Sequence, residues 1–186
     1  MTTQACAIWG EDFTRYDFGP GHPMAPVRLD LTARLCRELG VFDQVDVVDV
    51  APATDEVLHT VHDPEYVAAV RAISEDPTVA DGRWGIGTDD VPAFAGIHES
   101  SARIVSGSIE AARRVWTGEA EHGVNFTGGM HHAMRDRAAG FCVYNDIAAA
   151  IAWLLDQGVE RVAYVDVDVH HGDGVQEIFY EDPQIG

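Results

Sequence analysis

The chain has 186 residues, a length that fits one domain with a substantial core. Its 31 acidic and 12 basic residues give a net charge of −19, which argues against nonspecific binding to nucleic acid or anionic membranes, since both require positive surface. No apolar run approaches the roughly 18 residues of a membrane-spanning helix, and the first residues lack the basic start and apolar block of a signal peptide, so we expect a cytoplasmic protein.

Three cysteines are widely spaced along the chain: Cys6, Cys36 and Cys142. Their number is odd and no CxxC pair occurs, so the pattern predicts reduced thiols rather than a disulfide framework. A structural zinc site built on cysteine is not expected either.

Strand-like and helical patterns alternate along the chain. The first half contains a predicted strand, helix, strand and helix, in that order, at 5–9, 28–39, 45–50 and 63–73. The Asp-, Gly- and Pro-rich stretch 75–92 predicts a long loop, of a kind that is often functional. The remainder predicts a helix at 95–116, a strand at 122–126, a loop at 127–140, a helix at 146–157, a strand at 161–169 and a helix at 174–180.

This alternation predicts an α/β fold of three layers, α/β/α, with a mostly parallel sheet covered by helices on both faces. Ligands of such sheets bind outside the carboxyl ends of the strands. The two segments richest in catalytic residue types, GGMHH at 128–132 and DVDVHHGD at 166–173, lie at the predicted carboxyl ends of strands. We therefore expect both segments to meet at one site.

Three polar residues alternate along the end of the last predicted strand: Asp166, Asp168 and His170. Such residues project to one face of an extended strand, where polar groups are costly unless they are paired or bind a cation. Asp168 and His170 supply an oxygen and a nitrogen that suit Zn²⁺, and Asp166 lies one step deeper, where it can orient another group. A bare Asp-x-His is more often an ordinary hydrogen-bonded pair, but the longer DVDVHHGDG before a helix favours a zinc site.

His131 and His132 follow a Gly-Gly pair. Adjacent residues of a strand point to opposite faces, so both imidazoles can serve one site only from a loop, and glycines give the backbone that freedom. Beside a water-activating zinc, a histidine takes the proton of the water and later protonates the leaving amine. Asp166 and Asp173 are the candidate acceptors for the second nitrogen of each imidazole, and unequal partners would keep one imidazole neutral and the other protonated.

Substrate-contacting candidates lie on the predicted loops. Gly140 and Phe141 together could form an aromatic wall for an extended acyl-lysine-like stem, against the alternative of an ordinary core phenylalanine. Asp90 could hold a substrate backbone amide at the rim, against the alternative of a solvated loop carboxylate.

The sequence resembles the zinc-dependent histone deacetylase family, in particular its bacterial acetoin-utilization members. The resemblance rests on GPGHPMAPVRLDLT (19–32), HDPEYV (62–67), GTDDVPAF (87–94), GGMHHAMRDRAAGFCVYND (128–146) and YVDVDVHHGDGVQEIFY (164–180). These stretches occur in the family's order over nearly the whole chain. The resemblance implies an arginase/deacetylase-like fold, with residues 1–186 forming the N-terminal portion of a single deacetylase domain.

The resemblance also implies a role for each matching residue. Asp168 and His170 become zinc ligands, and His131 and His132 become the catalytic pair, hydrogen-bonded to Asp166 and Asp173 respectively. Gly140 and Phe141 line the acyl-lysine tunnel, Asp90 grips the substrate backbone, and Arg28 lies beside an internal channel for acetate exit. An inner potassium site would use Asp166, Asp168 and His170, partly through backbone carbonyls.

The implied activity is zinc-dependent hydrolysis of acetyl-lysine in a protein, with acetyl-CoA synthetase as a candidate substrate. Family members also have a further Asp zinc ligand and a catalytic Tyr that we cannot assign in this sequence, so we expect the chain alone to be impaired. The alternatives are a noncatalytic module that binds acyl-lysine or a partner, an acetylpolyamine deacetylase, and a dimanganese ureohydrolase such as arginase. The last is disfavoured because Gly172 occupies the acidic position of that family's DAHxD pattern.

Overall fold

The structure is a computed structural model that describes residues 3–186. In this range the strands are β1 (Thr3–Ile8), β2 (Asp46–Val48) and β3 (Ala120–Val124). The α-helices are α1 (Val27–Glu38), α2 (Asp55–Leu58), α3 (Pro64–Glu75), α4 (Ile97–Trp116), α5 (Asp146–Asp156) and α6 (Asp173–Phe179). Two short 3-10 helices, η1 (Glu11–Arg15) and η2 (Pro77–Val79), complete the described elements.

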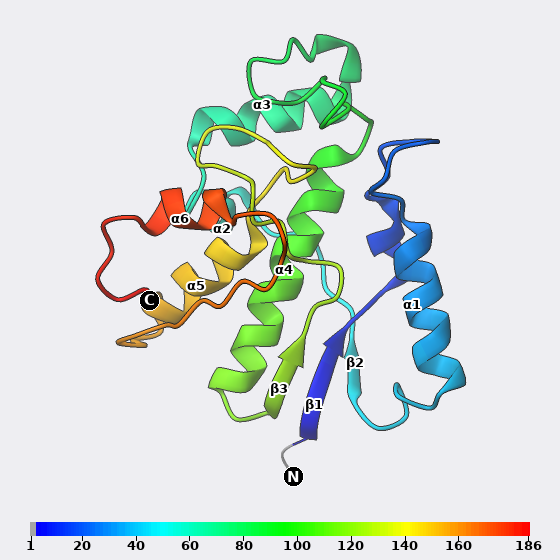
Figure 1. Ribbon diagram of the computed structural model, residues 1–186, viewed down its shortest axis with the longest axis vertical. Coiled ribbons are helices and arrows are strands. Elements are labelled where there is room, and N and C mark those ends of the chain that lie inside the picture. Colours follow the sequence, from blue (N-terminus) through cyan, green and yellow to red (C-terminus); the bar gives the residue numbers. More distant parts are fainter. Residues whose placement is uncertain (1–2) are drawn as a thin grey trace.

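The three strands form a parallel sheet in the order β2-β1-β3. Because β1 pairs with both neighbours, the connection through α1 and the connection through α4 run in opposite directions across the sheet. Right-handed crossovers then place these two helices on opposite faces, the arrangement visible in Figure 1. This confirms the predicted α/β class with a parallel sheet and helices around it.

Helix α4 packs closely against the sheet because small residues lie at the contact. A Cβ on Gly107 of α4 would lie 3.0 Å from Ile8 Cγ2, and a Cβ on Gly123 of β3 would lie 2.6 Å from the Ala111 carbonyl oxygen. Side chains of β1, α3, α4 and α5 join one hydrophobic core, which includes the fully buried Ile8, Val70 and Val105. The core therefore supports the strand ends from which the site loops emerge.

Most predicted elements are present with shifted ends. Helix α4 begins at Ile97 rather than residue 95, and β2 covers three residues where a strand was expected over 45–50. The four-residue helix α2 was not predicted, because so short a segment carries little periodicity. The predicted loop 127–140 lacks helices and strands, as expected.

The predicted strand at 161–169 is wrong. Its alternating β-branched residues favour an extended chain, but a strand also needs a hydrogen-bonding partner, and within residues 3–186 the segment makes one isolated parallel bridge, Val162 to Ile185. Three of its valines are exposed: Val165 is 78%, Val167 94% and Val169 92% accessible. In Figure 1 the segment runs as an orange coil apart from β3.

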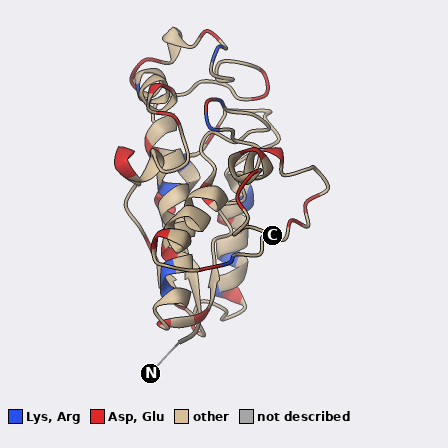
Figure 2. Ribbon diagram, turned by 90° about the vertical axis from the view of Figure 1, so that its left-hand side faces the viewer, with Lys and Arg blue, Asp and Glu red and all other residues tan. Residues whose placement is uncertain are grey.

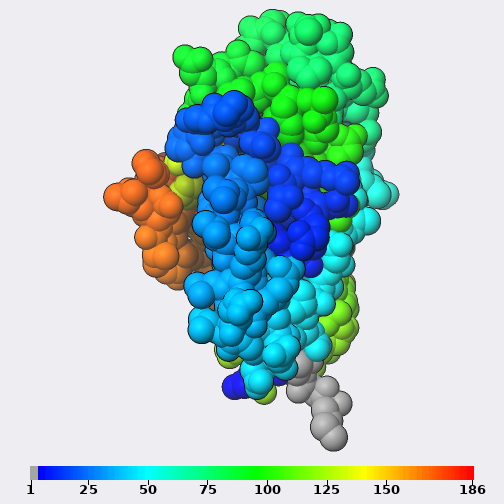
Figure 3. Space-filling model, turned by 90° about the vertical axis from the view of Figure 1, so that its right-hand side faces the viewer, coloured from blue at the N-terminus to red at the C-terminus, as the bar shows by residue number. Residues whose placement is uncertain are grey.

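The outer surface of the molecule is acidic without one dominant patch. Asp and Glu are spread over helices and loops of the face in Figure 2. In Figure 3 helix α1 lies on the outside of the molecule, and it exposes Leu31 and Leu35. Among residues 3–186 none of the helices combines the length and apolarity required to span a membrane.

Candidate active site

The loop after β3 brings His131 and His132 into contact. Their ring centroids lie 4.1 Å apart, and the His131 side chain is nearly buried. Helix α6 holds the backbone of this loop in place. The His131 carbonyl accepts hydrogen bonds from two residues in the first turn of α6, Gly174 N at 3.0 Å and Val175 N at 3.3 Å. A loop thus gives both imidazoles to one site, as the glycine-rich sequence predicts.

Each imidazole forms a hydrogen bond with a different carboxylate. His131 Nδ1 lies 2.7 Å from Asp166 Oδ2, and His132 Nδ1 lies 2.7 Å from Asp173 Oδ1. These are the pairings that the sequence analysis gave. With Nδ1 occupied, Nε2 of each ring is left to face a substrate.

Asp166 is held as a carboxylate by its surroundings. The hydrogen bond from His131, followed by the one from the Tyr164 hydroxyl, lowers the pKa of Asp166 from 3.8 to about 2. The group is therefore ionised at neutral pH and remains an acceptor. Burial, followed by the hydrogen bond to Asp166 and its charge, raises the pKa of Tyr164, which keeps its proton as the donor.

Asp168 and His170 provide two converging metal-ligand atoms. Asp168 Oδ1 and His170 Nδ1 form a hydrogen bond of 3.0 Å, somewhat shorter than the about 3.3–3.6 Å between two ligands of a tetrahedral zinc at bond lengths of about 2.0–2.2 Å. The rings of His170 and His132 are 6.0 Å apart, so this pair borders the histidines. Both side chains are largely exposed, and the hydrogen bonds from His170 lower the pKa of Asp168.

The donor set fits part of a zinc site. Within residues 3–186 there is no group of three His, Cys, Asp or Glu side chains spaced to hold a metal ion. A catalytic zinc has three protein ligands and one open position, so Asp168 and His170 supply two of the expected three. The potassium site expected at Asp166, Asp168 and His170 remains a prediction.

Gly140 lies directly against His132. A Cβ at Gly140 would come within 2.3 Å of His132 Cδ2, and the φ of 53° is itself in the left-handed region. The next residue, Phe141, also has a positive φ of 67°, and its ring lies 4.6 Å from that of His22 in an edge-on contact. Gly140 and Phe141 are therefore beside the histidine pair.

Asp90, on the 75–92 loop, contacts both Gly140 and His22. One carboxylate oxygen, Oδ2, accepts a hydrogen bond from Gly140 N at 2.8 Å, and the Asp90 carbonyl is 3.3 Å from His22 Nε2. Asp90 is exposed, and its other carboxylate oxygen accepts no hydrogen bond from residues 3–186. Its substrate-binding role is a prediction that this position supports.

Arg28 lies in the first turn of α1 and interacts electrostatically with Tyr16, whose hydroxyl donates a hydrogen bond to the Phe141 carbonyl. Its Nη2 contacts Met24 Sδ at 3.5 Å. Its proposed place beside an acetate channel remains a prediction.

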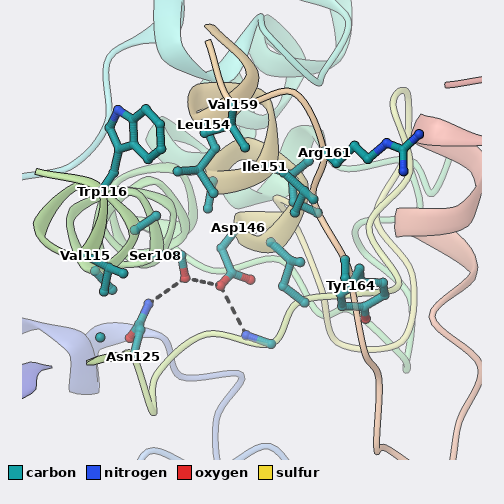
Figure 4. Close-up of a pocket in the computed structure, with 18 residues that line it drawn as sticks. Ser108, Val115, Trp116, Asn125, Asp146, Ile151, Leu154, Val159, Arg161 and Tyr164 are labelled. Carbon is teal, nitrogen blue, oxygen red and sulfur yellow. Dashed lines mark hydrogen bonds between the residues drawn. The ribbon is translucent and has the colours of Figure 1, made fainter. Parts of the chain in front are cut away.

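A cavity of about 690 Å³, drawn in Figure 4, is lined in part by Gly129, which lies just before the histidine pair in the sequence. It is bounded by α4, α5, the free side of β3 and the segment 159–164, and Asp146 and Gly129 face it. Neither His131, His132, Gly140 nor Phe141 lines it. The cavity is therefore distinct from the predicted acyl-lysine tunnel.

Sequence reasoning missed several polar residues that support the site. Tyr164 donates to Asp166, His22 packs on Phe141, and Asp146 binds the histidine loop. All three lie within stretches used for the family resemblance, but only contacts between distant segments reveal what they do. A tyrosine two residues before Asp166 was the one available signal, because it shares that residue's face in an extended chain.

Comparison with known proteins places the chain among deacetylases. Residues 22–186 match the histone deacetylase domain family. Similar curated proteins include acetoin utilization protein AcuC of Bacillus subtilis, 40% identical over 180 residues, and histone deacetylase RPD3 of Saccharomyces cerevisiae, 36% identical over 177 residues. These matches cover 96% and 93% of this chain, but 46% and 40% of the respective relatives.

A solved structure shows the same relationship in three dimensions. A histone deacetylase homologue from Aquifex aeolicus superimposes with a TM-score of 0.87 at 30% sequence identity, covering 98% of this chain and 49% of that one. The chain therefore spans about half the length of the relatives it matches.

Proposed function

The chain belongs to the histone deacetylase family, and from this premise we propose that its site serves the zinc-dependent hydrolysis of acetyl-lysine in proteins. The observation that carries the proposal is the pair of touching imidazoles, each bound through Nδ1 to its own carboxylate, beside a convergent Asp-His donor pair. Amide hydrolysis needs a proton acceptor for the attacking water and a proton donor for the leaving amine. His131 and His132 supply both groups at one place.

His131 and His132 differ in the part that we assign to them. His131 is the more buried ring, and ionised Asp166 accepts a hydrogen bond from its Nδ1. We assign to its Nε2 the acceptance of the proton from water. His132 lies nearer the exposed side and contacts Gly140 at the wall, where a leaving amine would be reached. We assign proton donation to the leaving amine to His132.

Zinc would be held by Asp168 and His170 together with a further ligand. When bound, it would supply Lewis-acid polarisation of the amide carbonyl and of water. The donor pair borders His132, so the proton-moving groups and the polarising group would act on the same bond.

The substrate would enter along Phe141. Its ring and Gly140 form one wall, and the Asp90 carboxylate at the rim accepts N–H groups, which suits the backbone of an acetylated protein. Acetyl-CoA synthetase is the candidate substrate that we retain. An acetylpolyamine would lack the backbone amides that Asp90 binds. Comparing the turnover of peptide and polyamine substrates therefore distinguishes a protein lysine deacetylase from an acetylpolyamine deacetylase.

A chimera tests the proposal. The matched 180 residues of the Bacillus subtilis relative are replaced by this chain, and acetate release from an acetyl-lysine peptide is measured with added Zn²⁺. We expect turnover by the chimera and a loss of at least about 100-fold in its His131→Ala, His132→Ala variant. Turnover that is equal in the two proteins, or a folded chimera that is inactive while its parent is active, contradicts the proposal.

A second function is favoured because residues 3–186 contain no group of three His, Cys, Asp or Glu side chains spaced to hold a metal ion. It is noncatalytic binding of acyl-lysine by the same wall. The isolated chain then binds an acetyl-lysine peptide with added Zn²⁺ but releases no acetate above the double histidine variant. Acetate release above that variant excludes this second function.

A further inference from the structure

The loop that carries the two histidines is held by buried groups that the proposed reaction does not use. His62, Asn145 and Asp146 are 2%, 0% and 1% exposed. All three direct hydrogen bonds at the backbone of 129–134, on both sides of the histidine pair. We refer to His62, Asn145 and Asp146 as the loop clamp.

Asp146 holds the backbone just before the histidines. Its carboxylate accepts from Met130 N at 2.7 Å and from Gly129 N at 3.2 Å, and it also binds the Ser108 hydroxyl of α4. Figure 4 shows the chain of hydrogen bonds from Asn125 through Ser108 to Asp146. Burial raises the pKa of Asp146, and the hydrogen bonds from Ser108, Met130 N and Gly129 N oppose that shift.

Asn145 holds the backbone just after the histidines. Its Nδ2 donates to the Ala133 carbonyl at 3.0 Å, and its Oδ1 caps α5 by accepting from Ala148 N at 2.9 Å. The Asn145 side chain therefore joins the loop to the N-terminal end of α5, a helix that core residues hold in position. Asp146 and Asn145 are adjacent, so one helix start binds both sides of the pair.

His62 links this helix start to the end of the loop. Its Nδ1 lies 2.9 Å from the Met134 carbonyl, and its Nε2 lies 3.0 Å from Asn145 N. A carbonyl can only accept and a backbone N–H can only donate, so the ring must carry its proton on Nδ1 and a lone pair on Nε2. Burial lowers the pKa of His62 to about 4, which agrees with a neutral ring at physiological pH.

We propose that the loop clamp sets the positions of His131 and His132, with His62, protonated on Nδ1, as a positioning residue that joins the start of α5 to the loop. The importance of this positioning for catalysis rests on the proposed function, because a displacement of about 1 Å in a catalytic group can lower the rate about 100-fold. The geometry itself does not depend on that function. His62 touches neither the donor pair nor the wall, so it is not a catalytic residue.

The experiment is ¹⁵N and ¹H NMR of the full chain with labelled histidine rings. In the unmodified protein we expect one histidine to show the neutral tautomer protonated at Nδ1 throughout pH 5–8, and its signals to disappear in His62→Gln. A His62 ring protonated at Nε2, or charged at pH 6, overturns the proposal without any variant having to fold.

The variants test whether the effect reaches the site. His62→Phe removes both hydrogen bonds, whereas the amide oxygen of His62→Gln can restore the one from Asn145 N. We expect the ring signals of His131 and His132 to shift in His62→Phe and to shift less in His62→Gln. His59→Gln, at an exposed position on the neighbouring turn, is the matched control and should leave them unchanged.

If the signals of His131 and His132 are the same in folded His62→Phe as in the unmodified chain, the clamp does not position them and the proposal fails. If they move as expected while the chimera described above shows no deacetylation, the clamp stands and the proposed function fails. The two results are read from different measurements.

Discussion

The two histidine rings are fixed by carboxylates of unequal exposure. Asp166 is 23% exposed at its side chain and is bonded by both His131 and Tyr164, whereas Asp173 is 46% exposed and lies in the first turn of α6. Water competes more strongly for the more exposed carboxylate, so the His131 pair is the more rigid of the two. This difference supports separate roles for the two rings in proton transfer.

The first residue-scale prediction concerns acid stability. Asp166 has a pKa lowered to about 2, so its ionised form stabilises the folded chain above the usual carboxyl pKa of 3.8, and this contribution is lost as the pH falls from about 4 towards 2. Asp166→Asn removes this titration. Denaturant unfolding of the metal-free chain should therefore show less loss of stability over that range in the variant. Identical pH profiles contradict the assigned pKa.

The second prediction concerns Gly140. Gly140→Ala adds a Cβ within 2.3 Å of His132 Cδ2, in addition to the strain of a positive φ. Gly118→Ala is the matched control, because Gly118 has a φ of 75° with nothing within 4 Å of the added atom. We expect both variants to lose about 1 kcal/mol of stability from the backbone. Only Gly140→Ala should displace the His132 ring signals in NMR; equal shifts in both variants contradict the contact.

At this scale the residue types of the site could be predicted, and the supporting contacts could not. Asp168 and His170 carry a recognisable spacing, and the Gly-Gly-x-His-His pattern indicates a loop. His62 is distant in sequence from Met134 and Asn145, so no local pattern indicates that it binds both. Such contacts depend on how α3, α4 and α5 pack.

At the scale of elements, the segment 161–169 shows that residues with a high strand propensity do not form a strand without a neighbouring strand to pair with. Its valines favour an extended backbone, but its backbone–backbone hydrogen bonds within residues 3–186 are made by Val162 and Tyr164 alone. The alternation nevertheless places Tyr164 and Asp166 together beside His131, while Val165 and Val167 face solvent. The side-chain period was predicted correctly although the strand was not.

The prediction at this scale compares two valines. Val167→Thr changes a 94% exposed side chain and should alter the free energy of unfolding by less than about 0.5 kcal/mol. Val70→Thr, in the core side of α3, buries a hydroxyl and should cost about 1–3 kcal/mol. Urea denaturation measures both. A large loss in Val167→Thr would mean that this valine is covered in solution.

For the whole molecule, alternation of strands and helices was sufficient to predict the parallel α/β class. Strand order was not predictable, because it depends on which edges of β1 receive β2 and β3. The order β2-β1-β3 sets α1 and α4 on opposite faces and leaves the β3 end free to deliver the histidine loop. The site is therefore a consequence of topology as well as of motif.

We propose that Asp168 and His170 hold zinc beside the histidine pair. Metal analysis of the purified chain at saturating Zn²⁺ tests it most directly, with Asp168→Ala, His170→Ala as the variant and His122→Ala, at an exposed position on β3, as the control. The predicted result is one zinc per chain in the unmodified protein and the control, and none in the double variant. Two manganese ions per chain, or zinc that persists in the double variant, would contradict it.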